Sequence, residues 1–432
     1  MTERRDRRAA PRWHRILPSS ATPDAAVLFL TRALRAVADG LVSVVLPGYL
    51  VLLGFSPLQV GAVVTGTLIG SAALTLAVGL RGYRLPRLRL LRTVAAVMVI
   101  TGVAFGSLGS FWPLFVVAVL GTLNPSAGDV SVFLPTEQAL LPGTVSDAQR
   151  TALYARYSLV GFSFAALGSL AAAVPEWAAR RLGVAEVSVL RSVFVFYACI
   201  GAAVWWFYRR LSPAIEPAAG APAVALGASR SIVRRLAAVF SLDAFAGGFV
   251  VQSLLVLWLA RRHGLSTALS GGVFFWAGLL SGASALVAVP LARRIGLIRT
   301  MVFTHLPANA LLVATAFMPN ATLAIGCLLA RSSLSQMDVP ARTSYVMAVV
   351  TPAERPAAAS VTNVPRSLAA AASPLIAGWM LDHSSFGWPL IIGGTLKALY
   401  DLTLLALFRN VRPPEEAHRD PPTPRPRRSA RD

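Results

Sequence analysis

The segment Ala25–Leu53 reads AAVLFLTRALRAVADGLVSVVLPGYLVLL, and it decides the fold class. It carries only three charged side chains, and it exceeds the roughly 20 residues that a helix needs to cross the hydrocarbon core of a bilayer. The apolar core of a signal peptide is much shorter, about 7–15 residues. The basic stretch before Ala25 therefore precedes a retained membrane helix.

Eleven further apolar runs follow along the chain. Because lipid offers no hydrogen-bonding partner to backbone groups, runs that span a bilayer should be helices. The alternating segments of about ten residues that mark a β-barrel do not occur in the sequence. The sequence predicts an all-α polytopic membrane protein with twelve spanning helices, over 25–53, 57–80, 93–110, 112–134, 150–174, 188–208, 236–260, 267–291, 300–318, 321–339, 357–381 and 385–408.

The overall composition agrees with a membrane protein. Of 432 residues 55% are hydrophobic and 14% are charged, with a mean hydropathy of +0.63, whereas soluble domains carry about 25% charged residues. A net charge of +21 could favour nucleic-acid binding, but the arginines lie in short runs between apolar segments. We therefore expect no nucleic-acid partner. The two cysteines form no metal motif, and no cofactor is predicted.

The distribution of arginine predicts the orientation. If the N-terminus is cytoplasmic, the inside segments hold 29 arginines and the outside loops hold five. Cytoplasmic loops carry the excess of basic residues, so both termini are predicted to lie in the cytoplasm, with the chain in the cytoplasmic (inner) membrane. Its basic tails can also contact anionic membrane lipid.

A Pro-, Ala- and Gly-rich stretch divides the chain into halves of six helices. The expected parts are a basic disordered N-tail (1–23), an N-terminal six-helix bundle (24–210), a cytoplasmic linker (211–235), a C-terminal six-helix bundle (236–410) and a disordered C-tail (411–432). A shift of 210 residues places Gly54 on Gly264, and Arg156 on Arg366. Arginine matches inside helices are informative because charge is costly there, so we infer that the halves are repeats.

The loops after the second and eighth helices are related and basic. They read GLRGYRLPRLRLLR (Gly79–Arg92) and LARRIGLIRT (Leu291–Thr300). With twelve helices and a 6+6 repeat, the chain resembles the major facilitator superfamily (MFS), whose loop motif is Gly-x-x-x-Asp-Arg-x-Gly-Arg. Both copies lack the acid, because Tyr83 and Arg293 stand at its position. The resemblance implies a solute site between the halves, lined by helices one, four, seven and ten.

Charged residues near the cytoplasmic ends of helices suggest an inner gate, since an intramembrane charge needs a partner or a wet cavity. We expect two clusters that close this side when the protein faces outward. Static pairing at helix ends is the alternative. The first cluster is Asp129 with Arg84 and Arg156, and the second is Asp338 with Arg294 and Arg366.

A second set of polar residues lies deeper in the helices predicted to line the cavity. Asp39 could take a proton or contact substrate, while Arg32 and Arg35 could instead extend to lipid phosphates. Lys397 and Asp401, four residues apart, are interpreted as a structural pair, and His305 as a helix-end histidine. The candidates for binding substrate or protons are Arg32, Arg35, Asp39, Asp243, Gln252, Arg331, Gln336 and Asn363.

These features predict a secondary active transporter that moves a small solute by alternating access. A proton-coupled exporter acting as a monomer is the first choice. Uptake of a small anionic metabolite is the alternative, and a substrate-free membrane scaffold or sensor is a more remote one. An enzyme is not expected, because the five histidines are scattered and neither an HExxH nor a GxxxxGK[ST] motif occurs in the sequence.

Overall fold

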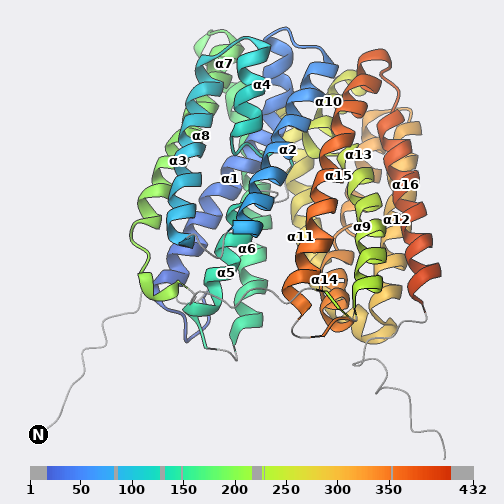
Figure 1. Ribbon diagram of the computed structural model, residues 1–432. Coiled ribbons are helices and arrows are strands. Elements are labelled where there is room, and N and C mark those ends of the chain that lie inside the picture. Colours follow the sequence, from blue (N-terminus) through green and yellow to red (C-terminus); the bar gives the residue numbers. More distant parts are fainter. Residues whose placement is uncertain are drawn as a thin grey trace, which may run out of the picture.

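The structure is a computed structural model, and it describes residues 17–81, 86–126, 132–146, 149–216, 226–227, 229–351 and 354–409. Within these ranges every regular element is a helix, and the helices stand in two bundles side by side (Figure 1). The start of the first helix and the end of the last lie at the same end of the molecule, which is called the termini side below (Figure 1).

The first bundle holds the helices of the N-terminal half, followed by the short helix η5 (Pro213–Ile215). They are α1 (Pro23–Leu52), α2 (Pro57–Arg81), α3 (Arg87–Ser107), α4 (Phe111–Leu120), α5 (Phe133–Leu140), η3 (Leu141–Thr144), α6 (Arg150–Ala171), α7 (Ala173–Leu182) and α8 (Glu186–Tyr208).

The second bundle holds the helices of the C-terminal half. They are α9 (Arg230–Gly248), α10 (Gln252–His263), α11 (Thr267–Ile295), α12 (Leu297–Phe317), α13 (Ala321–Ser332), α14 (Asp338–Ala348), α15 (Arg355–His383) and α16 (Trp388–Phe408).

Equivalent helices of the two halves begin 210 residues apart. This spacing holds for α2 and α11 (57 and 267), α3 and α12 (87 and 297), and α4 and α13 (111 and 321). It also holds for a backbone detail: Gly54 and Gly264 both adopt positive φ, of 87° and 66°, just after a helix end. A left-handed residue at that position favours glycine, which lacks the Cβ that would clash. The inferred internal repeat is therefore present in the backbone.

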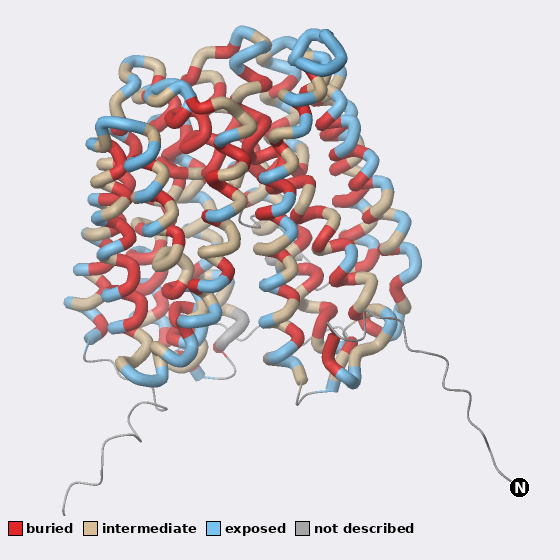
Figure 2. Tube along the Cα trace, turned by 180° about the vertical axis from the view of Figure 1, so that it is seen from behind, coloured by how far each residue is buried: buried red, intermediate tan, exposed pale blue. Residues whose placement is uncertain are grey.

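The described residues form an all-α membrane protein. They contain nine segments that are long and apolar enough to cross a bilayer, while α4 and α13 are apolar but shorter. Large apolar side chains cover the outer surface: Ile100 is 66% exposed, and Trp112 and Leu120 are each 71% exposed. Figure 2 shows exposed and half-exposed residues, in pale blue and tan, along the outer helices. Such a surface suits lipid rather than water.

The structure corrects four of the expected helices. The runs over 112–134 and 321–339 are not continuous, because α4 ends at residue 120 and α13 ends at residue 332 before α5 and α14 begin. The run over 236–260 is likewise divided between α9 and α10, and the run over 150–174 is divided between α6 and α7. The residues after α4 include Asn124, Pro125 and Ser126, which favour a loop, so the sequence contained a signal of this break that the single run over 112–134 ignored. Broken helices in a membrane are tolerated where the freed backbone groups face protein or a wet cavity.

The halves meet where α2 packs along α15 and where α6 packs along α11. Both contacts are closest at the end opposite the termini side. A Cβ atom on Gly61 would lie 2.6 Å from the carbonyl oxygen of Pro374, and one on Gly271 would lie 2.4 Å from that of Ser169. Only glycine allows backbones to approach this closely, so these positions seal one end of the interface.

We expect Gly61→Ala to lower the free energy of unfolding by about 1–3 kcal/mol, because the added methyl group would overpack the contact between α2 and α15. Gly272→Ala is the matched control: it lies in α11 with nothing within 4 Å of its ideal Cβ. Alanine should be neutral or slightly stabilising there, because it favours the helix. Chemical denaturation of both variants in detergent micelles measures the difference. Equal stability of the two variants would contradict a close contact.

Two carboxylates fasten the described ends of the linker. Glu216 accepts hydrogen bonds from the first backbone N–H groups of α3. Glu354, at the start of α15, accepts from the hydroxyls of Ser229 (2.6 Å) and Thr351 (2.9 Å) and from the N–H of Gly227. The Ser229 hydroxyl, with the other donors, holds the pKa of Glu354 below its usual value, because these bonds favour the charged form. The linker ends are thus tied to both halves.

Candidate functional site

Two adjoining cavities lie between the halves. One has a volume of about 420 Å³ and the other about 440 Å³, and both are lined by Phe162, Val339, Arg342 and Arg366. Volumes of this size are typical of sites for small molecules. The first cavity is bordered by α5 and α14, which lie toward the termini side (Figure 1). The second continues inward along α10, α11 and α13.

Polar contacts between the halves close the inner end of the second cavity. The amide nitrogen of Gln252 in α10 donates to the hydroxyls of Ser43 (3.0 Å) and Ser169 (3.2 Å), which belong to α1 and α6. The backbone N–H of Ser253 donates to the carbonyl of Pro125 at 3.2 Å. The cavities are therefore sealed at this end by contacts that must break before this end can open.

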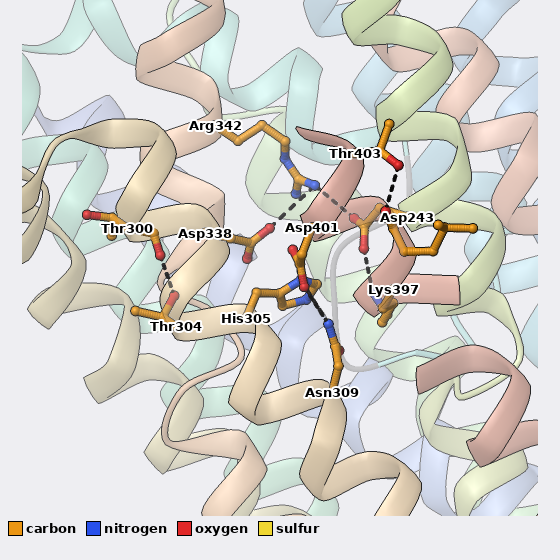
Figure 3. Close-up of polar contacts among 11 residues, drawn as sticks. Asp243, Thr300, Thr304, His305, Asn309, Asp338, Arg342, Lys397, Asp401 and Thr403 are labelled. Carbon is orange, nitrogen blue, oxygen red and sulfur yellow. Dashed lines mark hydrogen bonds and ion pairs between the residues drawn. The ribbon is translucent and has the colours of Figure 1, made fainter. Parts of the chain in front are cut away.

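The wall of the second cavity holds a network of buried charges. Arg342 in α14 pairs with Asp243 of α9 at 2.9 Å and with Asp338 one turn earlier at 3.5 Å. The other oxygen of Asp243 accepts a hydrogen bond from Lys397 of α16 at 2.6 Å. Figure 3 shows Asp243 held between the two cations. The sequence placed Arg342 in a loop, because it ended the tenth helix at residue 339.

A second buried contact lies behind this network. The Nδ1 atom of His305 is 2.9 Å from one oxygen of Asp401, and the amide of Asn309 donates to the other at 2.8 Å (Figure 3). The interpretation of Lys397 and Asp401 as a pair is wrong, because each side chain turns to a different helix. His305 also lines the cavity rather than lying at a helix end.

The cavities carry an excess of positive charge. Among the described residues that line them, five are cationic and two are carboxylates. Arg342 and Lys397 are neutralised by the carboxylates, whereas no described residue forms an ion pair with Arg331 or Arg366. The Nε atoms of both arginines are buried without a hydrogen-bond partner. A half-buried guanidinium group whose Nε atom lacks a partner carries a cost, so the site favours an anion.

The N-terminal half holds a separate buried cluster that the sequence did not reveal. Glu137 of α5, 0% exposed, accepts hydrogen bonds from Arg35, Tyr157, Tyr208 (2.6 Å) and Thr31 (2.9 Å). These donors come from α1, α6 and α8. Glu137 was missed because it lies three residues beyond the expected end of the fourth helix. The cluster joins four helices, and of its members Tyr157 also lines the first cavity, whereas Glu137 and Arg35 line neither.

The expected binding residues divide into two groups. Arg35 and Asp39 are buried in α1 and do not line the described cavities. The remaining six lie on the cavity walls: Arg32, Asp243, Gln252, Arg331, Gln336 and Asn363. Six of the eight candidates thus lie where a solute could contact them, and the part of all eight in binding stays a prediction.

The expected gate is only partly described. Arg84 and Asp129 lie outside the described residues. Asp338 pairs with Arg342 here, and no described ion pair joins it to Arg294 or Arg366. The gate was expected in the state closed on the termini side, which is not the state described, so it stays a prediction, as does the part played by Arg156.

Comparison with known proteins identifies the family. The model of the Major Facilitator Superfamily matches residues 28–335, and the chain belongs to this family. It is 22% identical over 426 residues to the uncharacterized membrane protein YJR124C of Saccharomyces cerevisiae (strain ATCC 204508 / S288c), covering 90% of this chain and 95% of that protein. It is 30% identical over 146 residues to the multidrug efflux protein YfmO of Bacillus subtilis (strain 168), covering 33% and 35%.

A solved structure supports the fold. The crystal structure of an auto inhibited POT family peptide transporter matches with a TM-score of 0.69 at 11% identity, covering 90% of this chain and 98% of that one. The chain is thus a multi-pass membrane protein and a secondary transporter, not an enzyme. Within the described ranges, no group of three or more side chains suited to metal binding occurs.

Proposed function

We propose that the chain exports a small solute from the cytoplasm in exchange for protons, by alternating access to the cavities between its halves. The observation that carries this proposal is a pair of cavities bordered by the termini side and sealed at the opposite end. Opening the contacts of Gln252 and closing the termini side would move a bound solute across the membrane.

The proposed topology has twelve crossings with both termini in the cytoplasm. Nine long apolar segments account for nine crossings, and α4 with α5, α13 with α14, and α15 supply three more. The arginine distribution supports a cytoplasmic termini side in the inner membrane. Each half of six crossings then forms one bundle, and the linker between them ends before α9 begins at Arg230, six residues earlier than the expected bound of 235.

Export and proton exchange have separate support. The partial similarity to a protein named for multidrug efflux favours export. Titratable side chains on the cavity wall, namely Asp243, His305 and Asp338, offer places where a proton could bind. Uptake of a small anionic metabolite is the second candidate, and the excess of positive charge in the cavities favours it.

Everted membrane vesicles test the direction and the coupling. A pH gradient, acidic inside, is generated and followed with a fluorescent acridine dye while ethidium, 1-naphthoate or uridine is added as a cationic, anionic or neutral solute. An exporter should dissipate the gradient and accumulate one of these solutes. Accumulation only in right-side-out vesicles with an inward proton gradient would establish uptake instead. Transport unchanged by collapsing the gradient with a protonophore would reject proton coupling.

A further inference from the structure

We propose that the cavity binds a small organic anion with an apolar body, and that Arg331 and Arg366 hold its negative group. This inference deepens the proposed function, because it names the class of solute that the transporter carries. It holds for export and for uptake alike, since both directions use the same cavity.

The charges of the cavity are unevenly paired. Asp243 and Asp338 are the carboxylates among the described lining residues; Arg342 pairs with both, and Lys397 pairs with Asp243. No described side chain forms an ion pair with Arg331 or Arg366, so these two groups add positive charge to the cavity. An anionic ligand would balance it, and a cationic ligand would raise the repulsion further.

Arg331 and Arg366 have hydrogen-bond donors that no described residue uses. Arg331 lies in the last turn of α13, where a basic side chain can also favour the helix dipole. However, its side chain lines the cavity, and its Nε atom is buried without a hydrogen-bond partner. Arg366 lies in the middle of α15, far from any helix end. Its Nε atom is also buried without a hydrogen-bond partner. Guanidinium groups bind carboxylate and phosphate oxygens in pairs, so both offer unused donors.

The cavity is large and partly apolar, which suits an organic anion. A volume of about 440 Å³ far exceeds the roughly 30 Å³ of one water molecule, so an inorganic ion would leave most of it unfilled. Phe162, Leu255 and Phe274 line the same space as the arginines. An anion with an aromatic or aliphatic body would cover these side chains and gain from their burial.

Thermal unfolding of the full chain, purified in detergent, tests this inference. The probes are 1-naphthoate, 1-naphthyl phosphate, the neutral 1-naphthalenemethanol and the cationic 1-naphthalenemethylamine, at constant ionic strength. A ligand that binds only the folded protein raises Tm with its concentration. We expect at least one anion to raise Tm in a saturable way, while the neutral and cationic probes have no saturable effect.

Variants then assign the two arginines. Arg331→Gln and Arg366→Gln should each raise the Kd of the anion about 10- to 100-fold, because each variant loses one charge-assisted interaction. Arg366→Lys should give an intermediate Kd, because it keeps the charge but loses the paired donors. Arg261→Gln is the matched control: it removes one exposed positive charge at the other end of the protein and should leave Kd within about twofold. Tm without probe shows whether each variant is folded.

Several results would overturn the inference. They are no response to either anion, an equal response to the neutral or cationic probe, or unchanged Kd in both glutamine variants. The vesicle assay stands apart from this one. Proton-coupled transport of ethidium without anion binding would reject the proposed anion site and support the proposed exporter. Anion binding without proton-coupled transport would support the anion site and reject proton-coupled export.

Discussion

Replacement of Asp243 by asparagine is expected to lower the free energy of unfolding by about 3–5 kcal/mol and to stop transport. Asp243 is 5% exposed, and its two oxygens contact Lys397 and Arg342. The substitution leaves the ammonium group of Lys397 buried without its carboxylate, and removing one partner of a buried ion pair carries a cost of this size. Chemical denaturation in detergent micelles, followed by tryptophan fluorescence, measures it.

A double variant separates charge pairing from other causes. In Asp243→Asn with Lys397→Met no cation loses its only partner, because Arg342 keeps Asp338 at 3.5 Å. We expect this pair of substitutions to recover at least half of the lost stability. Lys397→Met alone should cost less than Asp243→Asn, since Asp243 retains Arg342. A double variant as unstable as the sum of the single variants would show that the ion pair is not the cause.

In this network, the position of Asp243 could be predicted from the sequence, whereas its partners could not. Asp243 was identified because a carboxylate inside an apolar run needs a partner, and that rule depends on local sequence alone. Its partners lie 99 and 154 residues away, on α14 and α16. Pairing across such distances is decided by how the helices pack. The i,i+4 spacing of Lys397 and Asp401 suggested a local pair, which the structure replaces with contacts to other helices.

The broken helices limited the prediction in a second way. Twelve apolar runs and the shift of 210 residues gave the architecture, because lipid imposes hydropathy and the repeat imposes spacing. The interruption after Gly121 is marked by Asn124, Pro125 and Ser126, which the single run over 112–134 ignored, so Glu137 fell beyond the expected fourth helix. In the tenth helix the same error moved Arg342 into a loop. Both errors concern charged residues that join the first and fourth helices of a half.

Each half has an ion pair between its first and fourth helices, and the positions of the acid and the base are exchanged between the halves. In the N-terminal half, Arg35 of α1 pairs with Glu137 of α5. In the C-terminal half, Asp243 of α9 pairs with Arg342 of α14. The repeat has therefore kept a charged clamp at the same place in the bundle while exchanging the charges. Only the second clamp lines a cavity, which separates a structural use of the contact from a functional one.

Glu137→Gln should consequently destabilise the protein by about 3–5 kcal/mol while leaving anion binding intact in the folded fraction. Arg35 is 1% exposed and also lies over the ring of Phe133 at 4.3 Å. Without Glu137 its guanidinium group loses the carboxylate that offsets its burial. The amide also replaces one acceptor oxygen by a donor, so hydroxyl donors such as Tyr208 lose their acceptor.

Graded variants make this expectation specific. Tyr208→Phe removes a single hydrogen bond to the carboxylate and should cost about 1.5–3 kcal/mol. Arg35→Met combined with Glu137→Gln should regain part of the lost stability, because no buried charge remains alone. Glu186→Gln, which removes an exposed carboxylate at the start of α8, should stay within about 0.5 kcal/mol of the parent. If Glu137→Gln were as stable as Glu186→Gln, or if it lost anion binding while folded, the cluster would not be the purely structural clamp that its burial indicates.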